Sequence, residues 1–484
     1  MRTLNKKKAI IILAVIVLLI CGIIGGVYMV RTIEENKETE PTLEEIISSK
    51  LHAYETDLFD SKESFTSNEA AANYLLNWGK NKQINAEKDA YNNVIFTVVA
   101  MEGYEDAAPV VIICSYDAAD MDNYIESAAA ALTAAKNARN HGRYTVIFSP
   151  ESSRNKEGIT NLASSCFTDD TKVFYLEQSS ASKVSSLTGG QRIYRLSDKL
   201  KYEEPDYNKA YRISIGNIPS ESFSSKSGNI PNPIKNLGNL IANFKSTSLL
   251  FELASFNGGE SADMTPSSAS MTIVINGTDA AKFQTKMENA ISKFYEKNQE
   301  SYPEIQYTYE EVDMPSKVIA KEKTDNIVSL MYTAFNGVYN KDDNGNVTAI
   351  NNISKISTKD GRLKIDISSL SCSQECIDEI AESYQTISGL CGVDFKIREE
   401  YPVFDGGQAS AMLLEEFEGA FQKYTGDKSM KTGHVVEFTP CTLLQEKNSN
   451  MAVLYCGITS KTAEKFAGSL ITFLDNGPLE TEEE

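Results

Sequence analysis

The chain has 484 residues, of which 47 are Lys or Arg and 67 are Asp or Glu, giving a formal net charge of −20 at pH 7. Contact with nucleic-acid phosphates requires clustered Lys and Arg, so this acidic balance excludes nucleic acid as an expected partner. A chain of this length also exceeds what one hydrophobic core supports, and two or three domains are expected.

The first feature along the chain is an uninterrupted apolar run at residues 9–30, which contains no charged side chain. At about 1.5 Å per residue, a helix of this length reaches roughly 33 Å, enough to cross a hydrocarbon core of about 30 Å. The run is longer than the apolar part of a cleavable signal, roughly 7–15 residues, and no small-x-small cleavage site follows it. The run therefore predicts one uncleaved transmembrane helix.

Basic residues before this run set its predicted orientation. Residues 1–8 carry four Lys or Arg side chains and no acidic one, and short basic flanks of this kind stay on the cytoplasmic side. We expect a single-pass plasma-membrane protein with a juxtamembrane linker at 31–42 and the rest of the chain outside the cell. A lipid-modified Cys21 is the alternative, and it is disfavoured because the bulky Ile20 precedes it and the apolar run continues beyond it.

Residues 43–186 show the pattern of an α/β domain. β-Rich apolar runs at 94–99, 110–113 and 144–148 alternate with helical segments such as 123–138. This alternation predicts a sheet covered by helices.

The pattern changes after this region and later returns. Residues 187–399 read as strands and helices joined by Ser-, Asn- and Gly-rich turns, which is typical of an α+β domain. Residues 400–478 return to a helix, a strand and a closing helix, and an acidic tail follows at 479–484. An α+β domain inserted into a split α/β domain would account for this order.

Several short motifs carry a resemblance to a known family through their order and spacing. They are Asn68–Trp78, Asn92–Val94, Val110–Asp117, Asp122-Asn123, Phe256–Gly259, Asn336–Val338 and Tyr401-Pro402. Together they resemble the aminoacyl-histidine dipeptidases, within the wider group of carnosinase-like and aminoacylase-like di-zinc exopeptidases. The resemblance implies a split zinc-exopeptidase-like α/β domain and makes the insertion at 187–399 a lid of two α+β halves. It also favours a bacterial protein and a homodimer paired through the lid, as in dimeric relatives.

The family holds two zinc ions with two His and three carboxylates, and a Glu takes a proton from the metal-bound water. The resemblance places most of this set on residues that lack the required chemistry. The His of the family's His-x-Asp motif becomes Ser115, while its Asp is retained as Asp117. The paired Glu residues fall on Ser152 and Ser153, and Glu151 could be the base only after a slip of one position.

Three weaker metal candidates remain. Asp122 matches the family's bridging Asp, and Glu177 stands at the next carboxylate ligand. The last His ligand aligns with Val436, so His434 fills that position only with a two-residue insertion.

Lid positions that would handle a substrate have changed as well. The family's His before Ser-Gly becomes Lys226, and the Arg of its Pro-Arg-Glu stretch becomes Ser267. The whole chain contains three His residues, too few for two zinc sites together with these losses, so no cofactor is expected. We predict a pseudopeptidase that binds a peptide or protein partner without hydrolysing it.

Two other functions stay open. A divergent metal-dependent dipeptidase could build a rearranged single-zinc site from Asp117, Asp122, Glu177 and His434, and metal content separates this alternative from the first. A structural component of a cell-envelope complex could use the lid as a pairing surface, and co-purification from solubilised membranes would identify it.

Overall fold

The computed structural model describes residues 41–151, 156–427 and 430–475. The predicted membrane span at 9–30 and the acidic tail at 479–484 lie outside these residues. Within the described part of the chain, no helix is both long enough and apolar enough to cross a membrane.

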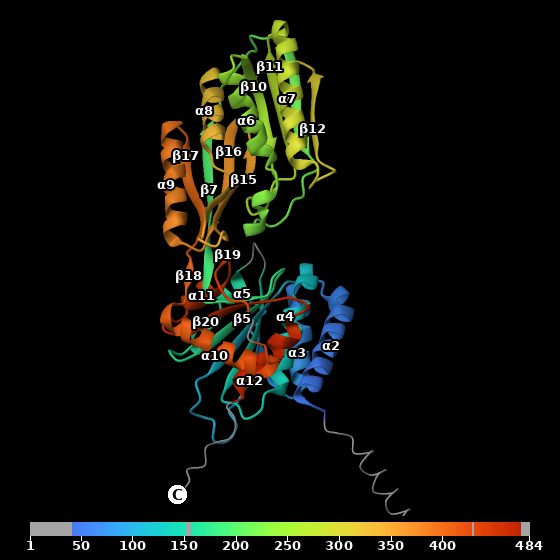
Figure 1. The fold of residues 1–484 in the computed structure, drawn as a ribbon, viewed down its shortest axis with the longest axis vertical. Coiled ribbons are helices and arrows are strands. Elements are labelled where there is room, and N and C mark those ends of the chain that lie inside the picture. Colours follow the sequence, from blue (N-terminus) through green and yellow to red (C-terminus); the bar gives the residue numbers. More distant parts are fainter. Residues whose placement is uncertain (1–40, 152–155, 428–429, 476–484) are drawn as a thin grey trace, which may run out of the picture. The chain divides into compact units, whose positions relative to one another are not determined.

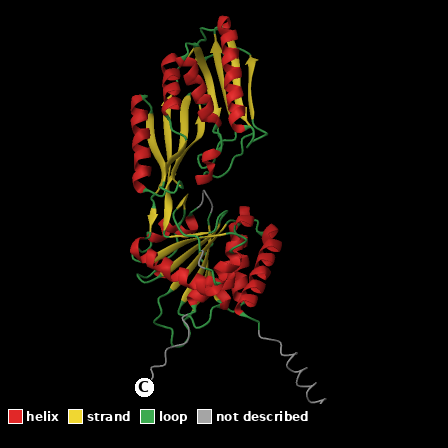
Figure 2. Cartoon of the chain, in the orientation of Figure 1, coloured by secondary structure: helices red, strands yellow, loops and turns green. Residues whose placement is uncertain are grey.

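The chain divides into two compact units, Met1–Lys50 and Leu51–Glu484. Of the first unit, only residues 41–50 are described, and they include the first turns of α2 (Leu43–Ser61). The second unit contains two sheets flanked by helices (Figures 1 and 2). The predicted combination of an α/β domain with an α+β insertion is therefore confirmed.

The first sheet has seven strands in the described residues, in the order β1-β2-β4-β3-β5-β20-β6. Its four central strands, from β4 to β20, are parallel, and the outer strands are antiparallel to their neighbours. The strands are β1 (Asn85–Lys88), β2 (Val94–Val98), β3 (Val110–Tyr116), β4 (Tyr144–Pro150), β5 (Lys172–Gln178), β6 (Lys183–Ser185) and β20 (Ala452–Ile458).

Helices cover both faces of this sheet, which explains why β3 is apolar and buried at nearly every position. On one face, Phe174 of β5 contacts Phe417 and Phe473, which belong to α10 and α12. On the other face, Val173 and Tyr175 pack in one core with residues of α5 and α11. The helices of this domain are α3 (Asn68–Asn81), α4 (Ile125–Asn137), α5 (Glu157–Thr160), α10 (Gly407–Thr425), α11 (Cys441–Gln445) and α12 (Ala463–Leu474), with the short turns η1 (Lys62–Ser64), η2 (Ala118–Asn123) and η3 (Ser164–Cys166).

The second sheet, which we call the lid sheet, has eleven strands in the described residues. Its main path is β12-β9-β11-β10-β15-β16-β7-β17, while β14 pairs with β15 and both β18 and β19 pair with β7. The strands are β7 (Leu187–Lys199), β9 (Lys209–Gly216), β10 (Phe251–Gly258), β11 (Ala269–Ile275), β12 (Gln306–Val312), β14 (Gly337–Lys341), β15 (Val347–Ser357), β16 (Arg362–Ser371), β17 (Asp394–Tyr401), β18 (Phe404–Asp405) and β19 (Val435–Phe438), beside the separate pair β8 (Tyr202–Glu203) and β13 (Val318–Ile319).

Helices line this sheet as well, and they form for identifiable local reasons. The lid helices are α6 (Pro233–Ser246), α7 (Ala280–Asn298), α8 (Lys321–Thr333) and α9 (Gln374–Leu390), with η4 (Ser225–Asn229) and η5 (Gly277–Asp279). In α6, the Asn232 side chain caps the first turn and Pro233 stands at its start. Apolar residues at helical spacing, from Ile234 to Phe244, are buried against the sheet.

The lid sheet consists of two halves joined at one point. Strands β10 and β15 pair only through Gly258 and Ile356. The next residue, Gly259, has φ +74°, and a Cβ there would overlap the carbonyl oxygen of Ser354. Only glycine fits this close approach, which accounts for the Gly-Gly pair at the junction.

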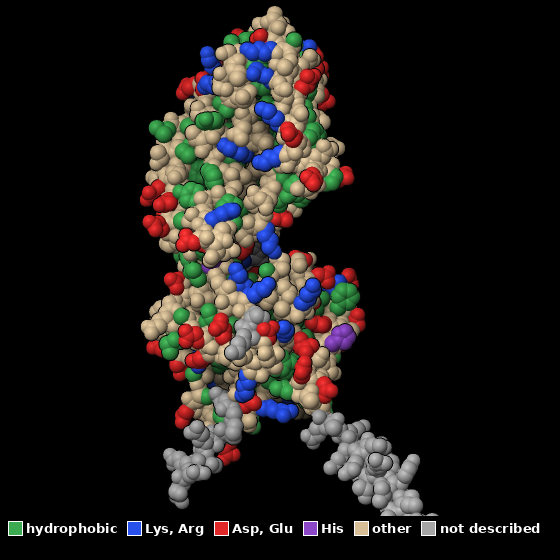
Figure 3. All heavy atoms as spheres, in the orientation of Figure 1, with side chains coloured by type: hydrophobic (Ala, Val, Ile, Leu, Met, Phe, Trp, Pro, Cys, Tyr) green, Lys and Arg blue, Asp and Glu red, His purple; other side chains and the backbone are tan. Residues whose placement is uncertain are grey.

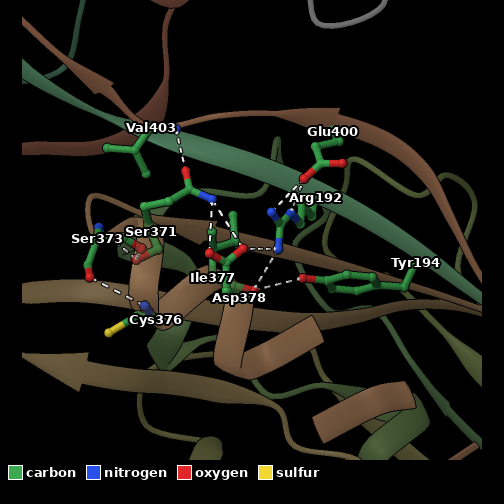
Figure 4. A network of polar contacts seen from close by, with 10 residues as sticks. Arg192, Tyr194, Ser371, Ser373, Cys376, Ile377, Asp378, Glu400 and Val403 are labelled. Carbon is green, nitrogen blue, oxygen red and sulfur yellow. Dashed lines mark hydrogen bonds and ion pairs between the residues drawn. The ribbon is translucent and has the colours of Figure 1, made fainter. Parts of the chain in front are cut away.

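A polar network fixes α9 to the lid sheet (Figure 4). Arg192 of β7 pairs with Asp378 of α9 at 2.6 Å and with Glu400 of β17 at 2.5 Å. Its guanidinium also donates to the carbonyl oxygen of Ile377 at 3.3 Å. The fork of donors on one Arg therefore joins a helix and two strands.

Candidate functional site

Three neighbouring parallel strands of the first sheet end at the same edge. The order β4-β3-β5 means that the chain, after β4, crosses to the other side of β3. In open α/β sheets, ligands bind in the crevice outside the carboxyl ends of the strands at such a switch point. The residues that end β3, β4 and β5 are therefore the first place to look for a site.

Strand periodicity brings three of these residues to one face. Side chains two apart on a strand point the same way, so Tyr175 and Glu177 of β5 share a face. Ser115, at the end of β3, belongs to the same face because its hydroxyl contacts the Tyr175 hydroxyl at 2.5 Å. Both residues are almost fully buried, and each satisfies the other's polar group.

Glu151 follows β4 directly and is 3% exposed. Its Oε1 atom accepts a hydrogen bond from the Ile159 backbone N–H at 2.7 Å and another from the Ser149 hydroxyl at 3.1 Å. Its Oε2 atom has no hydrogen-bond partner within the described residues. Burial raises the pKa of Glu151 to about 7, although the Ile159 N–H, Lys156 and Ser149 act in the opposite direction.

The pKa of Glu177 is shifted in the same direction as that of Glu151, and burial is again the main cause. Burial raises its pKa to about 7, while a hydrogen bond from Tyr455 and the charge of Lys156 act to lower it, and Glu437 acts to raise it. A carboxyl group in this state exchanges its proton near neutral pH.

Lys156 is the cation of this cluster. Burial lowers the pKa of its ammonium, and the charges of Glu151 and Glu177 oppose that shift. Its Nζ lies 5.3 Å from the centroid of the Phe438 ring. One ammonium group thus interacts with both carboxyl groups at the strand ends.

These side chains line a first cavity of about 250 Å³. Residues of the first sheet, of the lid and of β19 contribute to it. They are Ser115, Tyr124, Glu151, Lys156, Tyr175, Glu177, Gln191, Ser222, Phe223, Ser224, Asp263, Leu370, Glu437, Phe438 and Pro440.

A second cavity, of about 480 Å³, shares Glu177, Ser224, Glu437 and Phe438 with the first. It also contains basic side chains, whose contacts are defined. Lys183 donates to the carbonyl oxygen of His434 at 2.9 Å, Lys226 donates to the Ser180 hydroxyl, and the His434 Nε2 atom lies 3.2 Å from the carbonyl oxygen of Val347.

Glu437 lines both cavities and is hydrogen-bonded to a residue of the lid. Its Oε1 atom accepts from the backbone N–H of Ser225 at 2.9 Å and from the hydroxyl of the same residue at 2.6 Å. Ser225 begins η4 and lines the second cavity, so a carboxylate of β19 fixes this short 3-10 helix of the lid beside that cavity.

The structure brings five of the candidate residues singled out in the sequence to these cavities. Ser115 and Glu151 line the first cavity, Glu177 lines both, and Lys226 and His434 line the second. Ser267 lies elsewhere in the lid, where its hydroxyl donates to Glu260 at 2.5 Å.

Asp117 and Asp122 are not among the described residues that line these cavities. Asp117 caps η2, because its side chain accepts from the Ala119 N–H at 3.0 Å. Asp122 is 63% exposed and pairs with Lys62 at 2.6 Å. Ser152 and Ser153 lie outside the described residues.

The di-zinc centre of the resembled family requires ligands that can be compared with the side chains found here. Across residues 41–151, 156–427 and 430–475, no three His, Cys, Asp or Glu side chains form a group suited to a metal ion. Among the described residues at the strand ends, the donor set is two carboxyl groups, one ammonium and two hydroxyls, with no thiolate and no imidazole, whereas zinc prefers thiolate, imidazole and carboxylate ligands. These residues do not fit the di-zinc centre.

Without a di-zinc centre, the hydroxyl and carboxyl groups at the strand ends can support few reaction steps. Burial raises the pKa of Tyr175 well above its usual value, so its hydroxyl stays protonated and cannot take a proton from Ser115. Ser115 is therefore not an activated nucleophile. Glu151 and Glu177 can exchange protons near neutral pH, and the cavities can hold a polar ligand.

Sequence reasoning missed Lys156, Tyr175 and Glu437. The alternation of side chains along β5 would have placed Tyr175 beside Glu177, since the two are separated by one residue. Lys156 follows a loop and belongs to no motif, so only the fold brings it to the carboxyl groups. Glu437 follows Val436, the residue aligned with the family's His, and could have been noticed as a neighbouring carboxylate.

Comparison with solved structures identifies the fold: the first sheet and the lid sheet, with their helices, are arranged as in a solved dipeptidase. The fold matches aminoacylhistidine dipeptidase from Vibrio alginolyticus with a TM-score of 0.69 and 17% identity, covering 89% of this chain and 98% of that chain. The resemblance predicted from sequence motifs is thus confirmed for the fold.

Weaker matches extend to other peptidases. A tripeptidase from Staphylococcus aureus has a TM-score of 0.42 and 9% identity, covering 87% of this chain and 98% of that chain. A metallo-carboxypeptidase from Sulfolobus solfataricus has a TM-score of 0.41 and 12% identity, covering 84% and 94%. No protein-family model and no curated protein matches the sequence.

Proposed function

We propose that this chain binds a short peptide in the cavities at the strand ends and does not hydrolyse it. The observation that carries the proposal is Lys156, a cation that lines the same cavity as Glu151 and Glu177 and whose charge acts on both carboxyl groups. In the resembled family, metal ions supply positive charge to carboxylates of this kind. A lysine ammonium supplies charge as well, but it cannot generate a bound hydroxide.

A short peptide is the ligand class that the fold and the cavities favour. The matched solved structure is named as a dipeptidase acting on aminoacyl-histidine. Ligand sites commonly have volumes of about 300–1,000 Å³, and the cavity of about 480 Å³ falls in this range. A dipeptide or an extended peptide end would suit these dimensions.

Equilibrium binding tests the proposal directly. Purified full-length chain, solubilised in detergent, would be titrated with Ala-His, Ala-Ala and Gly-Gly by isothermal calorimetry. We expect saturable binding of at least one dipeptide, and its affinity should fall in Glu177→Gln but not in Asp122→Asn, because Asp122 does not line either cavity. Failure of all three dipeptides to bind would contradict the proposal.

We further propose that residues 9–30 anchor the protein in the plasma membrane with the body outside the cell. Protease added to intact cells, or to protoplasts where a wall obstructs it, should remove the body and spare a small N-terminal fragment. Recovery of protected full-length protein would contradict this topology.

A rearranged hydrolase and a structural envelope component are the two alternative functions. A rearranged hydrolase needs Asp117, Asp122, Glu177 and His434 at one metal, but Asp122 pairs with Lys62 on the surface and the His434 ring contacts a backbone carbonyl. A structural envelope component paired through the lid predicts a stable homodimer or a co-purifying partner. Size measurement in detergent separates that alternative from a monomeric binding protein.

A further inference from the structure

One oxygen of a buried carboxyl group in the first cavity is unpaired. Glu151 is 3% exposed and lines this cavity, yet its Oε2 atom has no hydrogen-bond partner within the part of the chain that the structure describes. Buried polar atoms in folded proteins almost always have a partner, because leaving one unpaired is costly. A donor from outside the chain is the natural partner for this atom.

The geometry of Glu151 limits the kind of donor. Its Oε1 atom already accepts from the Ile159 N–H and the Ser149 hydroxyl. A guanidinium group binds best with two parallel bonds to both oxygens of one carboxylate, and only one oxygen of Glu151 lacks a partner among the described residues. A group with a single N–H directed at Oε2, such as a primary ammonium, fits better.

The charge around the first cavity also favours a cation. Among the described residues that line it, four are acidic, Glu151, Glu177, Asp263 and Glu437, and one is basic, Lys156. A bound metal would need several of these carboxylates to converge, and no such group of three is found among the described residues. An ammonium ion needs no fixed coordination geometry, because it offers three donors around one nitrogen.

The second cavity contains basic side chains that the first cavity does not share. Lys183, Lys226 and His434 line it, and none of them lines the first cavity. Lys226 uses one of its three donors on the Ser180 hydroxyl, which leaves two for a ligand. An anionic group would be favoured there.

We propose that the first cavity takes the free N-terminal ammonium of a short peptide, which donates a hydrogen bond to Glu151 Oε2, and that the peptide's carboxylate end lies beside Lys226. This inference rests on the proposed function, since it assigns the orientation of the peptide that the cavities would bind. It makes a free amino group, rather than a particular side chain, the main requirement for binding.

The titration of Glu151 gives this orientation a pH dependence. Its pKa is raised by burial to about 7, and only the carboxylate form attracts an ammonium. Affinity for a free amino group should therefore rise as the pH increases from about 6 to about 7.5, before the ligand's own amine, with a pKa of about 8, loses its proton.

The experiment compares matched ligands on the full-length chain. Ala-His, N-acetyl-Ala-His and the amide of Ala-His would be titrated into the wild type, Glu151→Gln, Lys226→Gln and the control Asp122→Asn. We expect N-acetylation to weaken binding to the wild type by about 10-fold or more, as expected for loss of a charged hydrogen bond. In Glu151→Gln, Ala-His should weaken by a similar factor and the acetylated peptide should not change.

The second end is tested in the same titrations. Amidation should weaken binding to the wild type, and Lys226→Gln should remove the difference between Ala-His and its amide. The N-acetyl comparison in the wild type needs no variant, so it decides the inference even if Glu151→Gln fails to fold.

The outcomes separate the inference from the proposed function. Equal binding of Ala-His and N-acetyl-Ala-His to the wild type, or an N-acetyl effect that survives in folded Glu151→Gln, would overturn the ammonium assignment and leave the proposed function standing. An amide effect that survives in Lys226→Gln would overturn the placement of the carboxylate end. Absence of binding by Ala-His, Ala-Ala and Gly-Gly would overturn the proposed function and this inference with it.

Discussion

The hydroxyls of Ser115 and Tyr175 form a hydrogen bond of 2.5 Å between the neighbouring parallel strands β3 and β5. The resemblance in sequence aligns Ser115 with a metal-binding His of the dipeptidase family, an assignment that stays a prediction. Both side chains are buried, and the raised pKa of Tyr175 keeps its hydroxyl protonated. The pair is therefore a satisfied polar contact in the core and not an activated nucleophile.

This pair predicts a specific pattern of stability changes. Ser115→Ala leaves the Tyr175 hydroxyl buried without its partner and should lower the free energy of unfolding by about 1–3 kcal/mol. Tyr175→Phe should have a similar effect, while the double variant should cost less than the sum of the two single changes. Urea denaturation followed by circular dichroism measures all three, and strictly additive losses would contradict the coupling.

Stability should depend on pH through Glu151. Its pKa is about 7 in the folded chain because of burial, above its ordinary value of 4.5. Between these values the folded state binds more protons than the unfolded state, so the free energy of unfolding falls as the pH rises. The slope from this group is at most about 1.4 kcal/mol per pH unit and flattens above about pH 7. Glu151→Gln should reduce the measured slope between about pH 5 and 7; an unchanged slope would show that this group does not titrate in that window.

Strands β7 and β19 pair so closely that replacing one glycine of β7 should destabilise the fold strongly. A Cβ on Gly189 would overlap the backbone carbonyl of Val436, whereas one on Gly419 in α10 meets nothing within 4 Å. Gly189→Ala should lower the free energy of unfolding by more than about 3 kcal/mol or prevent folding. Gly419→Ala should raise it by about 0.5–1 kcal/mol, because alanine is the better helix former. A well-folded Gly189→Ala of unchanged stability would contradict the close approach of these strands.

Two arginines of β7 offer a matched pair. Arg195 binds both oxygens of Asp366 at 2.6 Å, and that carboxylate is 5% exposed. The partners of Arg192 (Figure 4), Asp378 and Glu400, are 47% and 46% exposed. Arg195→Met should therefore cost about 3–5 kcal/mol, since it leaves a buried charge unpaired. Arg192→Met should lower the free energy of unfolding clearly less than Arg195→Met. If chemical denaturation ranked the two variants in the opposite order, burial of the carboxylate partner would not decide the loss.

The fold could be predicted in outline because its signals are local. The apolar run that became β3 and the Ala-rich segment that became α4 are patterns of a sheet with both faces covered. The insertion was marked by its polar turns. Acidic and basic side chains are interspersed on the face drawn in Figure 3, as expected of a charged, soluble surface.

The site could be predicted only in part. Ser115 and Glu177 were found through the resemblance to the dipeptidase family, which aligns them with metal-ligand positions of that family. Lys156 was not found, because its role depends on folding of the chain after β4, which brings it to Glu177 on another strand. The orphaned oxygen of Glu151 depends equally on tertiary packing, since Ile159 and Ser149 occupy only its other oxygen.

Hydrolysis of a bound dipeptide is the most direct test of a binding protein built on a dipeptidase fold. Full-length chain would be incubated with Ala-His, Ala-Ala and Gly-Gly, with zinc, manganese or cobalt added in turn, and the products followed by mass spectrometry. We predict that the dipeptides bind and are recovered intact, because the described residues at the strand ends do not fit a di-zinc centre and Ser115 is not activated as a nucleophile. A general base alone supplies only about 10²–10⁴-fold. Turnover that requires added metal and disappears in Glu151→Gln or Glu177→Gln would contradict the account and establish a working hydrolase.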